Sequence, residues 1–557
     1  MNRRKFLAGL PPGVASVLPK HAPSGKATAQ FHRVSTGLEP YTGAWGRAQS
    51  AHLLRRTMFG ARKQDIDTVA AMTIGTAVDL LLQPGPQPPP PPDYNDANGS
   101  TAWSTAAYNS SRDNAFLAFT ISWWCDLMLS QAISLREKMT LFWHNHFVSS
   151  WTSVKDSRYM YRQNALFRQH ALGNCKELTK QVTLDPAMLR YLNGNTNKKG
   201  TPNENYAREL QELFTIGKGA EIAPGNYTNY TEEDIKAAAR VLTGYSDDTG
   251  AIKHKFTAAN HDSGNKTFSA NYGGKVIAGR SNESGAMAEL DELLGMIFDQ
   301  EATALYLCRK LYRWFVYYQI DAATEQNMIV PMAQLLRSNN YDVAPVLRAL
   351  FSSAHFYDSA NVGCMIKNPV DLVIGTLRLF TFPDLNPDKL NFKYFGLRTL
   401  RRTMATMQAD IMGHPNVAGW PAYWQEPVYH RAWINADTLQ KRVKFTNDLA
   451  TDGYKLDEGY ATLLIDPIEI TSFVSDPSDV SKLIDESATL LFPNAITPRQ
   501  HDQIKAVLLP GLPDYEWTVE WEDYQKDPTN DSKKNAVAGK LSAMIKHLLA
   551  MAEYQLS

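Results

Sequence analysis

The chain has 557 residues, with 57 Lys and Arg against 57 Asp and Glu, so its formal net charge is zero. A balanced charge provides no basic excess for binding nucleic acid. Beyond its first residues the chain has no apolar run near the roughly 18 residues of a membrane span, and its four cysteines form no CxxC or CxxCH pattern. We therefore expect no nucleic-acid partner, no membrane span and no c-type haem, while disulfides stay open.

The first residues, MNRRKFLAGL, are typical of a twin-arginine export signal, because an Arg-Arg pair at positions 3–4 precedes apolar residues. Residues 27–29, Ala-Thr-Ala, suit a cleavage site. The apolar stretch in between is short and interrupted by prolines, so an ordinary basic tail is the alternative. We expect residues 1–29 to be an export signal and the protein to be periplasmic or extracellular.

Residues 30–112 are expected to form a tether, short helices and a surface loop. The spacing of apolar residues predicts two or three short helices between 49 and 82. Residues 84–92, PGPQPPPPP, predict an extended polyproline segment that crosses the outside of a helical domain.

Residues 113–450 are expected to form the main helical domain, beginning with two long amphipathic helices over 114–147. The stretch 185–217 predicts a helix, a polar loop and a second helix. Asp185 and Pro186 suit the N-cap and first-turn positions of the first of these helices. The second opens near residue 202, and its apolar stripe has helical spacing: Tyr206, Leu210, Leu213 and Phe214.

Thr231, followed by two glutamates and Asp234, predicts another capped helix start. Residues 246–283 alternate enough for one or two small hairpins, and 414–435 is a Trp- and Pro-rich loop. Further helices are predicted over 285–297, 301–318, 323–337, 342–353, 368–380, 397–412 and 436–450. Residues 451–557 are expected to add helices packed on the main domain. No parallel βαβ rhythm is present, so we predict an all-α fold: a large multi-helix domain with one or two small β-hairpins and long surface loops.

Eight blocks of this sequence resemble, in order, the domain of unknown function 1800 (DUF1800) family of exported bacterial proteins. The blocks are AHLLRRTMFG (51–60), LREKMTLFWHNHF (135–147), HALGNCKELTKQVTLDPAMLRYL (170–192), PNENYARELQELFTIG (202–217), YTEEDIKAAARVLTGY (230–245), HDSGNKTF (261–268), IKNPVDLVIGTLRLF (366–380) and HPNVAGW with AWINADTLQKR (414–442). The resemblance implies a fold and an exported protein, and no activity. It also implies a partner, because members are often encoded beside an exported, sulfatase-like family (domain of unknown function 1501).

The second central helix contains an arginine and three carboxylates: Glu204, Arg208, Glu209 and Glu212. Glu204, Arg208 and Glu212 stand at i, i+4 and i+8, which places them on one face of a regular helix. If this face is buried, ion pairs tie helices together. If it lines a cleft, one glutamate with a raised pKa can act as acid or base. The predicted catalytic residues are Glu204, Arg208, Glu209 and Asp185.

Five residues are candidate metal ligands: His144, His146, Glu212, His261 and Asp262. The first two histidines are two residues apart at a helix end, so on a regular helix they point about 200° apart. The structural alternatives are histidines bonded to loop carbonyls and an aspartate that caps the amides of a turn.

The loop 193–204 has oxygen-bearing residues at the spacing of a calcium-binding EF-hand, including Asn193, Asn195, Asn197 and Glu204. Its first position is Asn rather than Asp, and Lys198 stands where the turn requires Gly. Ca²⁺ is therefore weakly suggested, against an Asn-rich loop whose side chains bond their own backbone. No nucleotide-binding glycine pattern is present.

Substrate contacts are predicted at polar and aromatic residues near these groups: Asn203, Asn205, Lys266, His414, Trp420 and Trp433. The loop that holds the last three can wall a pocket or pack over the helical core.

From these features we predict an exported, soluble, metal-dependent hydrolase that acts on an extracellular, polymeric substrate. The identity of the divalent metal is open. One alternative is a non-enzymatic assembly partner of an exported sulfatase-like protein. The other is a metal-free glycan hydrolase with paired carboxylates such as Glu204 and Asp185.

Overall fold

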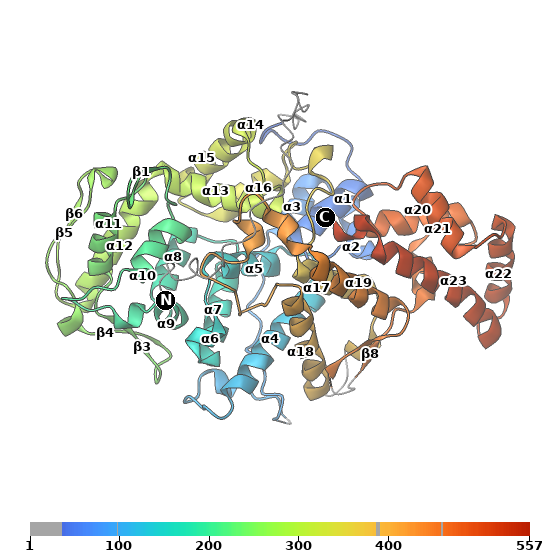
Figure 1. Ribbon diagram of the computed structural model, residues 1–557, viewed down its shortest axis with the longest axis horizontal. Helices are drawn as coiled ribbons and strands as arrows, with labels where there is room; N and C mark the ends of the chain where they lie inside the picture. The colour runs from blue at the N-terminus through green and yellow to red at the C-terminus, as the bar shows by residue number, and fades with distance from the viewer. Residues whose placement is uncertain (1–35, 97, 386–389, 458–460) are drawn as a thin grey trace, which may run out of the picture. The chain divides into compact units, whose positions relative to one another are not determined.

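The computed structural model describes residues 36–557, apart from 97, 386–389 and 458–460. Helices packed on helices make up nearly all of this part, and the strands it contains pair into two-stranded antiparallel sheets (Figure 1). The prediction of an all-α, multi-helix fold with small hairpins is confirmed. The predicted export signal at 1–29 lies outside the described residues.

Three short helices open the described chain, as predicted: α1 (Arg47–Thr57), α2 (Lys63–Ala70) and α3 (Ile74–Leu81). The proline-rich segment follows without regular structure and is held against the domain by side chains that reach its carbonyls. Trp103 Nε1 donates to Pro91 O at 2.7 Å, and Arg136 Nη1 donates to Pro86 O at 2.6 Å.

The next helices surround a buried polar contact. They are α4 (Asp113–Ser130), α5 (Arg136–His146), α6 (Trp151–Val154), α7 (Ser157–Gln169), α8 (Cys175–Thr183) and α9 (Pro186–Tyr191). Arg168 of α7 donates to both oxygens of Glu137 of α5, at 2.7 and 2.9 Å, and Trp124 Nε1 of α4 donates to the same carboxylate at 3.0 Å. A carboxylate that accepts three bonds joins three helices, because a buried charge must be paired and hydrogen-bonded.

The second central helix changes its winding halfway. It begins as α10 (Asn205–Glu209) and continues as one π-helical turn over Leu210–Phe214. Tyr206, Leu210 and Phe214 are buried, as the apolar stripe predicted, while Leu213 is half-buried. A π-turn inserts a residue into the helical repeat, so side chains after Glu209 are rotated from their α-helical positions.

Small hairpins and one capped helix follow. The hairpins pair β1 (Glu221–Ala223) with β2 (Asn226–Tyr227), β3 (Tyr245–Asp248) with β4 (Lys253–Phe256), and β5 (Lys266–Thr267) with β6 (Val276–Ile277). Between the first two lies α11 (Glu232–Val241), whose capping box of Thr231 and Asp234 is present as predicted. In the second hairpin Tyr245 pairs with Phe256 and Asp248 with Lys253.

The remaining helices follow the predicted ranges, except that the helix predicted over 397–412 begins and ends earlier, at Leu390–Thr406. They are α12 (Glu283–Asp299), α13 (Glu301–Phe315), α14 (Ala322–Thr324), α15 (Val330–Ser338), α16 (Val343–Phe351), α17 (Pro369–Leu379), α18 (Leu390–Thr406) and α19 (Ala436–Ala450). A second π-turn, Glu325–Ile329, joins α14 to α15.

The last hundred residues form a short hairpin and four helices: β7 (Tyr454–Lys455), β8 (Thr462–Leu463), α20 (Val480–Leu491), α21 (Pro498–Leu508), α22 (Asp514–Lys526) and α23 (Asp531–Ala550). Helix α23 packs on α19 across the predicted boundary at 450/451, and Ser542 Oγ donates to Ala450 O at 2.6 Å. Residues 35–557 form one compact unit.

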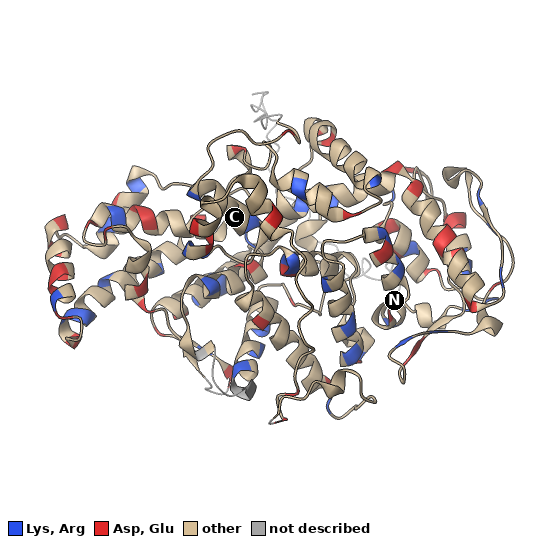
Figure 2. Cartoon of the chain, turned by 180° about the vertical axis from the view of Figure 1, so that it is seen from behind, with Lys and Arg blue, Asp and Glu red and all other residues tan. Residues whose placement is uncertain are grey.

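Acidic and basic residues are interspersed along the helices (Figure 2), in keeping with the zero net charge. Among the described residues, no helix has both the length and the apolar character needed to cross a membrane.

Candidate functional site

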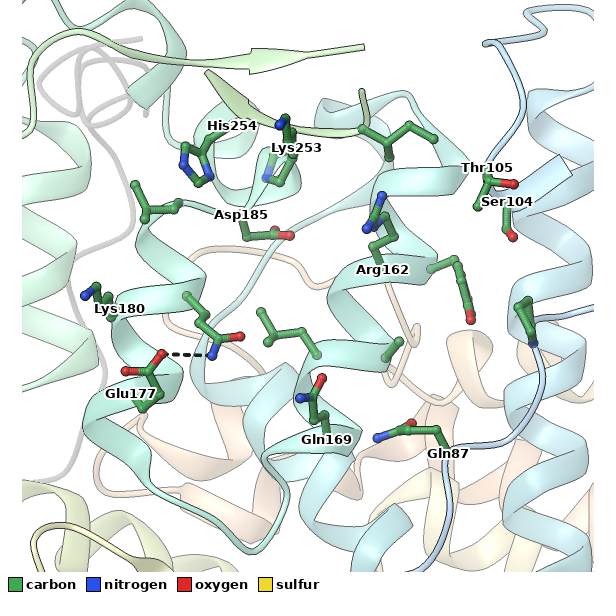
Figure 3. A pocket seen from close by; sticks show the side chains of 18 of the residues that line it. Gln87, Ser104, Thr105, Arg162, Gln169, Glu177, Lys180, Asp185, Lys253 and His254 are labelled. Carbon is green, nitrogen blue, oxygen red and sulfur yellow. Dashed lines mark hydrogen bonds between the residues drawn. The ribbon is translucent and has the colours of Figure 1, made fainter. Parts of the chain in front are cut away.

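An open pocket of about 710 Å³ lies among the proline-rich segment, α7, α8 and β4 (Figure 3). Six charged or titratable residues line it: Arg162, Glu177, Lys180, Asp185, Lys253 and His254. Five amide or hydroxyl side chains join them: Gln87, Ser104, Thr105, Gln169 and Gln181. Concave sites with a few converging polar groups are where small ligands and substrates usually bind.

Local sequence signals set up two walls of this pocket. Helix α7 begins after Asp156, whose Oδ1 accepts from Arg158 N at 3.1 Å, and α8 begins after Asn174, whose Oδ1 accepts from Glu177 N at 2.9 Å. Each helix buries an apolar face, including Phe167 and Leu178, and turns its polar face to the pocket. The capped, amphipathic character of the two helices therefore determines which side chains line the site.

Asp185 lies at the wall of the pocket and is 6% exposed. As predicted, it is the N-cap of α9: its Oδ2 accepts from Met188 N at 3.1 Å, and also from Gln163 Nε2 at 2.8 Å. Burial raises the pKa of Asp185 to about 7, although these hydrogen bonds and the charge of Arg162 oppose the rise. A carboxyl that is half protonated near neutral pH can either donate or accept a proton.

The other charged side chains of the pocket differ in whether they have a hydrogen-bond or ion-pair partner. Lys180 pairs with Asp291 at 2.6 Å, and Glu177 accepts from Gln181 Nε2 at 2.9 Å. Within the described residues, Arg162 and Lys253 have no hydrogen-bond or ion-pair partner. Burial lowers the pKa of His254, so its imidazole is neutral at pH 7.

Sequence reasoning identified Asp185 and missed the rest of this pocket. The polyproline segment was expected to cross the outside of the domain; residues 84–87 are exposed, and Pro88 and Pro90 also form part of the pocket wall. The other lining residues come from the neighbouring helices α7 and α8 and from distant parts of the chain: Ser104, Thr105, the β4 hairpin and Met287. The one available signal was the set of polar residues at helical spacing on α7 and α8, which a solvent-exposed face would also show.

The predicted carboxylate–arginine face lies on the outside of α10 and is not part of this pocket. Arg208 contacts Glu204 at 3.1 Å, at the predicted i, i+4 spacing. Its closer partner is Glu232 of α11, whose two oxygens accept from the guanidinium at 2.6 and 2.7 Å. Glu232 raises the pKa of Arg208. These ion pairs join α10 to α11, so the face ties two helices together, which was the alternative to its lining a cleft.

The π-turn over Leu210–Phe214 separates Glu212 from that network, while Glu209 is the last residue of α10 before it. Glu212 pairs with Lys218 at 2.6 Å and accepts from Tyr230 Oη at 3.4 Å, instead of continuing the Glu204–Arg208 row. Burial, followed by the charge of Glu212, raises the pKa of half-buried Glu209 to about 7. Glu209 is therefore the second carboxyl of the predicted set that titrates near neutral pH, although it lies outside the pocket lining.

The two histidines of the WHNHF block are buried and bonded to backbone. His144 Nε2 accepts from Met412 N at 3.0 Å, and His146 Nε2 contacts Phe214 O at 3.0 Å. Burial lowers the pKa of His144 to about 3, so the ring is neutral and its one lone pair is committed to the Met412 amide. A metal ion bound by His144 would have to displace that bond.

The three residues of the 414–435 loop that were predicted to contact substrate, His414, Trp420 and Trp433, are also in the core. His414 stacks on Trp420 with ring centroids 4.4 Å apart, and its ring lies 4.7 Å from that of His144. Trp420 and Trp433 contact edge to face at 5.9 Å, and both are buried. A substrate could reach these residues only if the loop moved.

At the NHDSG turn the side chains of His261, Lys266 and Glu289 form a wholly buried cluster, and the Asp262–Arg240 pair beside it is partly exposed. Lys266 Nζ bonds both Glu289 Oε2 and Asp262 O, and His261 Nε2 lies 3.3 Å from Glu289 Oε1. The Asp262 carboxylate pairs with Arg240 at 2.6 Å and accepts from the Gly264 amide at 2.9 Å, as a turn-capping aspartate does.

The 193–204 loop directs its Asn side chains at protein groups. Asn195 Nδ2 donates to Asp247 at 2.9 Å. Asn197 is buried, donates to Ala239 O at 2.8 Å and accepts from Asn203 N at 2.8 Å, while Asn203 Oδ1 accepts from Asn205 N at 3.0 Å. These bonds correspond to the structural alternative for the loop.

The predicted metal ligands are thus distributed over separate clusters. Across residues 36–557, leaving aside the positions that the structure does not describe, no three His, Cys, Asp or Glu side chains gather as a group able to hold a metal ion. The divalent metal stays a prediction from the sequence.

Together these features define a mostly helical protein with an open pocket, lined by both polar and apolar side chains, and a buried carboxyl at its wall. A family model, described as protein of unknown function (DUF1800), matches residues 52–556, which is nearly the whole described chain. The chain belongs to this family, as its sequence blocks indicated. The comparisons with curated proteins and with solved structures found no match.

Proposed function

We propose that this protein is a hydrolase that cleaves a glycan in the pocket lined by Asp185. The observation that carries the proposal is Asp185 itself: a carboxyl with a pKa of about 7, at the wall of an open pocket that holds a second carboxylate, Glu177. Two carboxyl groups, of which one stays protonated near neutral pH, are the usual machinery of glycoside hydrolysis.

The two carboxyl groups take different roles because their surroundings differ. Asp185 is buried and half protonated near pH 7, so it serves as the acid that protonates the leaving oxygen. Glu177 is exposed and serves as the base or nucleophile. The paired carboxylates predicted from the sequence were Asp185 and Glu204, and Glu177 replaces Glu204 in this proposal because Glu204 contacts Arg208 outside the pocket.

The rest of the pocket suits a polyhydroxylated chain. Gln87, Gln169 and Gln181 provide amides, and Ser104 and Thr105 provide hydroxyls, so the wall offers both donors and acceptors to sugar hydroxyls. The proposal takes the protein to be exported to the periplasm or the cell exterior, as predicted, where polymeric glycans are found.

Release of reducing ends from a panel of soluble polysaccharides tests this proposal. We expect Asp185→Asn and Glu177→Gln each to lower the rate at least about 100-fold, because each removes one carboxyl. Asn keeps the N-cap of α9, so Asp185→Asn should fold. Glu522→Gln, at an exposed carboxylate of α22, is the matched control and should keep full activity. A folded Asp185→Asn variant with wild-type activity would contradict the proposal.

Elemental analysis of protein purified without chelators tests the metal-dependent form of the hydrolase. A stoichiometric metal that is lost in His144→Ala would support that form, whereas a metal content below about a tenth of an equivalent would favour the carboxylate mechanism. The exported sulfatase-like partner also stays a prediction, and co-purification of such a protein with this chain is its test.

A further inference from the structure

We infer that the pocket recognises an acidic glycan, a polysaccharide that bears carboxylate or sulfate groups, through Arg162 and Lys253. This inference rests on the proposed function and specifies its substrate class.

The uncommitted charge of the pocket is positive. The Arg162 guanidinium on α7 and the Lys253 ammonium on β4 both line the pocket, and among the described residues neither has a hydrogen-bond or ion-pair partner. Glu177 accepts a bond from the neutral amide of Gln181 and keeps its negative charge, whereas Asp185 accepts from Gln163 and Met188 and is partly protonated near pH 7. Two unpaired cations against one unpaired carboxylate leave a positive balance that favours an anionic ligand, and a guanidinium can bind a carboxylate or a sulfate through two parallel bonds.

The amides and hydroxyls on the wall favour a glycan over other polyanions. Single-stranded nucleic acid is usually bound by aromatic faces that stack on successive bases, and Tyr161 is the one aromatic residue that lines this pocket. A sugar chain needs hydrogen-bonding groups along its length, and Gln87, Gln169 and Thr105 supply them on both sides of Arg162 (Figure 3).

Ligand binding should be coupled to the protonation of Asp185. The positive charge of Arg162 favours the ionised form of Asp185. An anion bound to Arg162 offsets that charge and adds a negative charge of its own, so Asp185 should take up a proton. The other charged or titratable groups that face this part of the pocket are Glu177 and Lys180 on α8 and Lys253 and His254 on β4.

Isothermal titration calorimetry of the full chain with hexasaccharides tests the inference. The probes are oligogalacturonate for carboxylate, chondroitin sulfate for sulfate with carboxylate, and cellohexaose as the neutral chain. We expect an acidic hexasaccharide to bind at least about tenfold more tightly than the neutral one, and Arg162→Gln to remove that preference. Arg499→Gln, at an exposed arginine of α21, is the matched control and should bind like the wild type. Titrations at pH 7.5 in two buffers of different ionisation enthalpy should show proton uptake, which Asp185→Asn abolishes.

The outcomes separate this inference from the proposed function. Equal affinity for neutral and acidic chains, or wild-type binding by Arg162→Gln, would overturn the inference, even if an Asp185-dependent cleavage of neutral chains upheld the hydrolase. Acidic binding without any cleavage would uphold the recognition of acidic glycans and remove the hydrolase. Equally tight binding of polyglutamate would show that the pocket selects charge without selecting sugar, and would overturn the glycan assignment.

Discussion

Asp185 caps α9, as its place directly before Pro186 predicts, and it also lines the pocket, which the packing of other segments decides. The N-cap position required a short side chain with a free oxygen, which the sequence pattern predicted. The pattern did not predict the raised pKa, because that comes from burial by α7 and α8, which are separate segments of the chain. A capping residue thus becomes a titrating group through its neighbours.

Because the pKa of Asp185 is raised, its effect on stability depends on pH. The pKa rises from about 3.8 in the unfolded chain to about 7 in the fold, so between these values the folded state binds more protons and stability falls as pH rises. At about 1.4 kcal/mol for each unit of pKa, the loss is roughly 4 kcal/mol at most. The Asp185→Asn variant has no carboxyl at this position, so its stability should not show this fall as pH rises.

Urea unfolding of wild type and Asp185→Asn at pH 4.5 and pH 8 checks this expectation. The difference in the free energy of unfolding should shift in favour of the variant at pH 8. Glu522→Gln, at an exposed site, should show no such shift. A difference that is the same at both pH values would mean that Asp185 has an ordinary pKa.

At the scale of single elements, the π-turn after Glu209 decides which carboxylates share a face. On a continuous α-helix Glu204, Arg208 and Glu212 would form one row. The inserted residue turns Glu212 to Lys218 and Tyr230, and Arg208 instead finds Glu232 on α11. Sequence spacing predicts an α-helical face correctly only as long as the helix keeps its regular winding.

The β5–β6 hairpin is joined to α12 by the buried Lys266–Glu289 pair, in which both side chains are fully buried. Lys266→Met leaves the Glu289 charge without its ammonium partner, so we expect a loss of about 3 kcal/mol in the free energy of unfolding. The double variant Lys266→Met/Glu289→Gln removes the charge as well and should be more stable than the single variant.

Denaturant titration of the wild type, Lys266→Met and the double variant measures the free energy of unfolding of each. Lys236→Met is the matched control, because Lys236 pairs with Glu233 at the surface and such pairs contribute little. A Lys266→Met variant as stable as this control would show that the buried pair does not fasten the hairpin.

At the scale of the whole molecule, residues beyond 450 are built into the main helical domain. Arg442 of α19 donates to Gln555 Oε1 at 2.8 Å, Lys367 N donates to Gln555 O at 2.8 Å, and the Thr376 and Tyr554 hydroxyls lie 2.7 Å apart. These buried bonds cross from the last residues to α17 and α19. We therefore expect α23 and α19 to open together.

Native-state hydrogen exchange of the full chain tests this cooperativity. The slowest amides of α19 and α23 should report the same free energy of opening, because buried bonds and packing link the two helices. The exposed α22, which packs on α23 and lies away from α19, should open at lower free energy. If α23 opened well before α19, residues 451–557 would be a separate folding unit.

The sequence by itself determined the fold class, the helices with clear caps and apolar stripes, the small hairpins and the family, because each depends on residues close together in the chain. Thr231, Asp185 and the 436–450 helix are examples in which local hydrogen bonding and periodicity were sufficient. Only the tertiary structure decided which polar residues face the pocket and which are buried. Burial moved His144 and Trp420 into the core and brought Asp185 together with Arg162 and Lys253, since desolvation and long-range packing depend on neighbours that the local sequence does not contain.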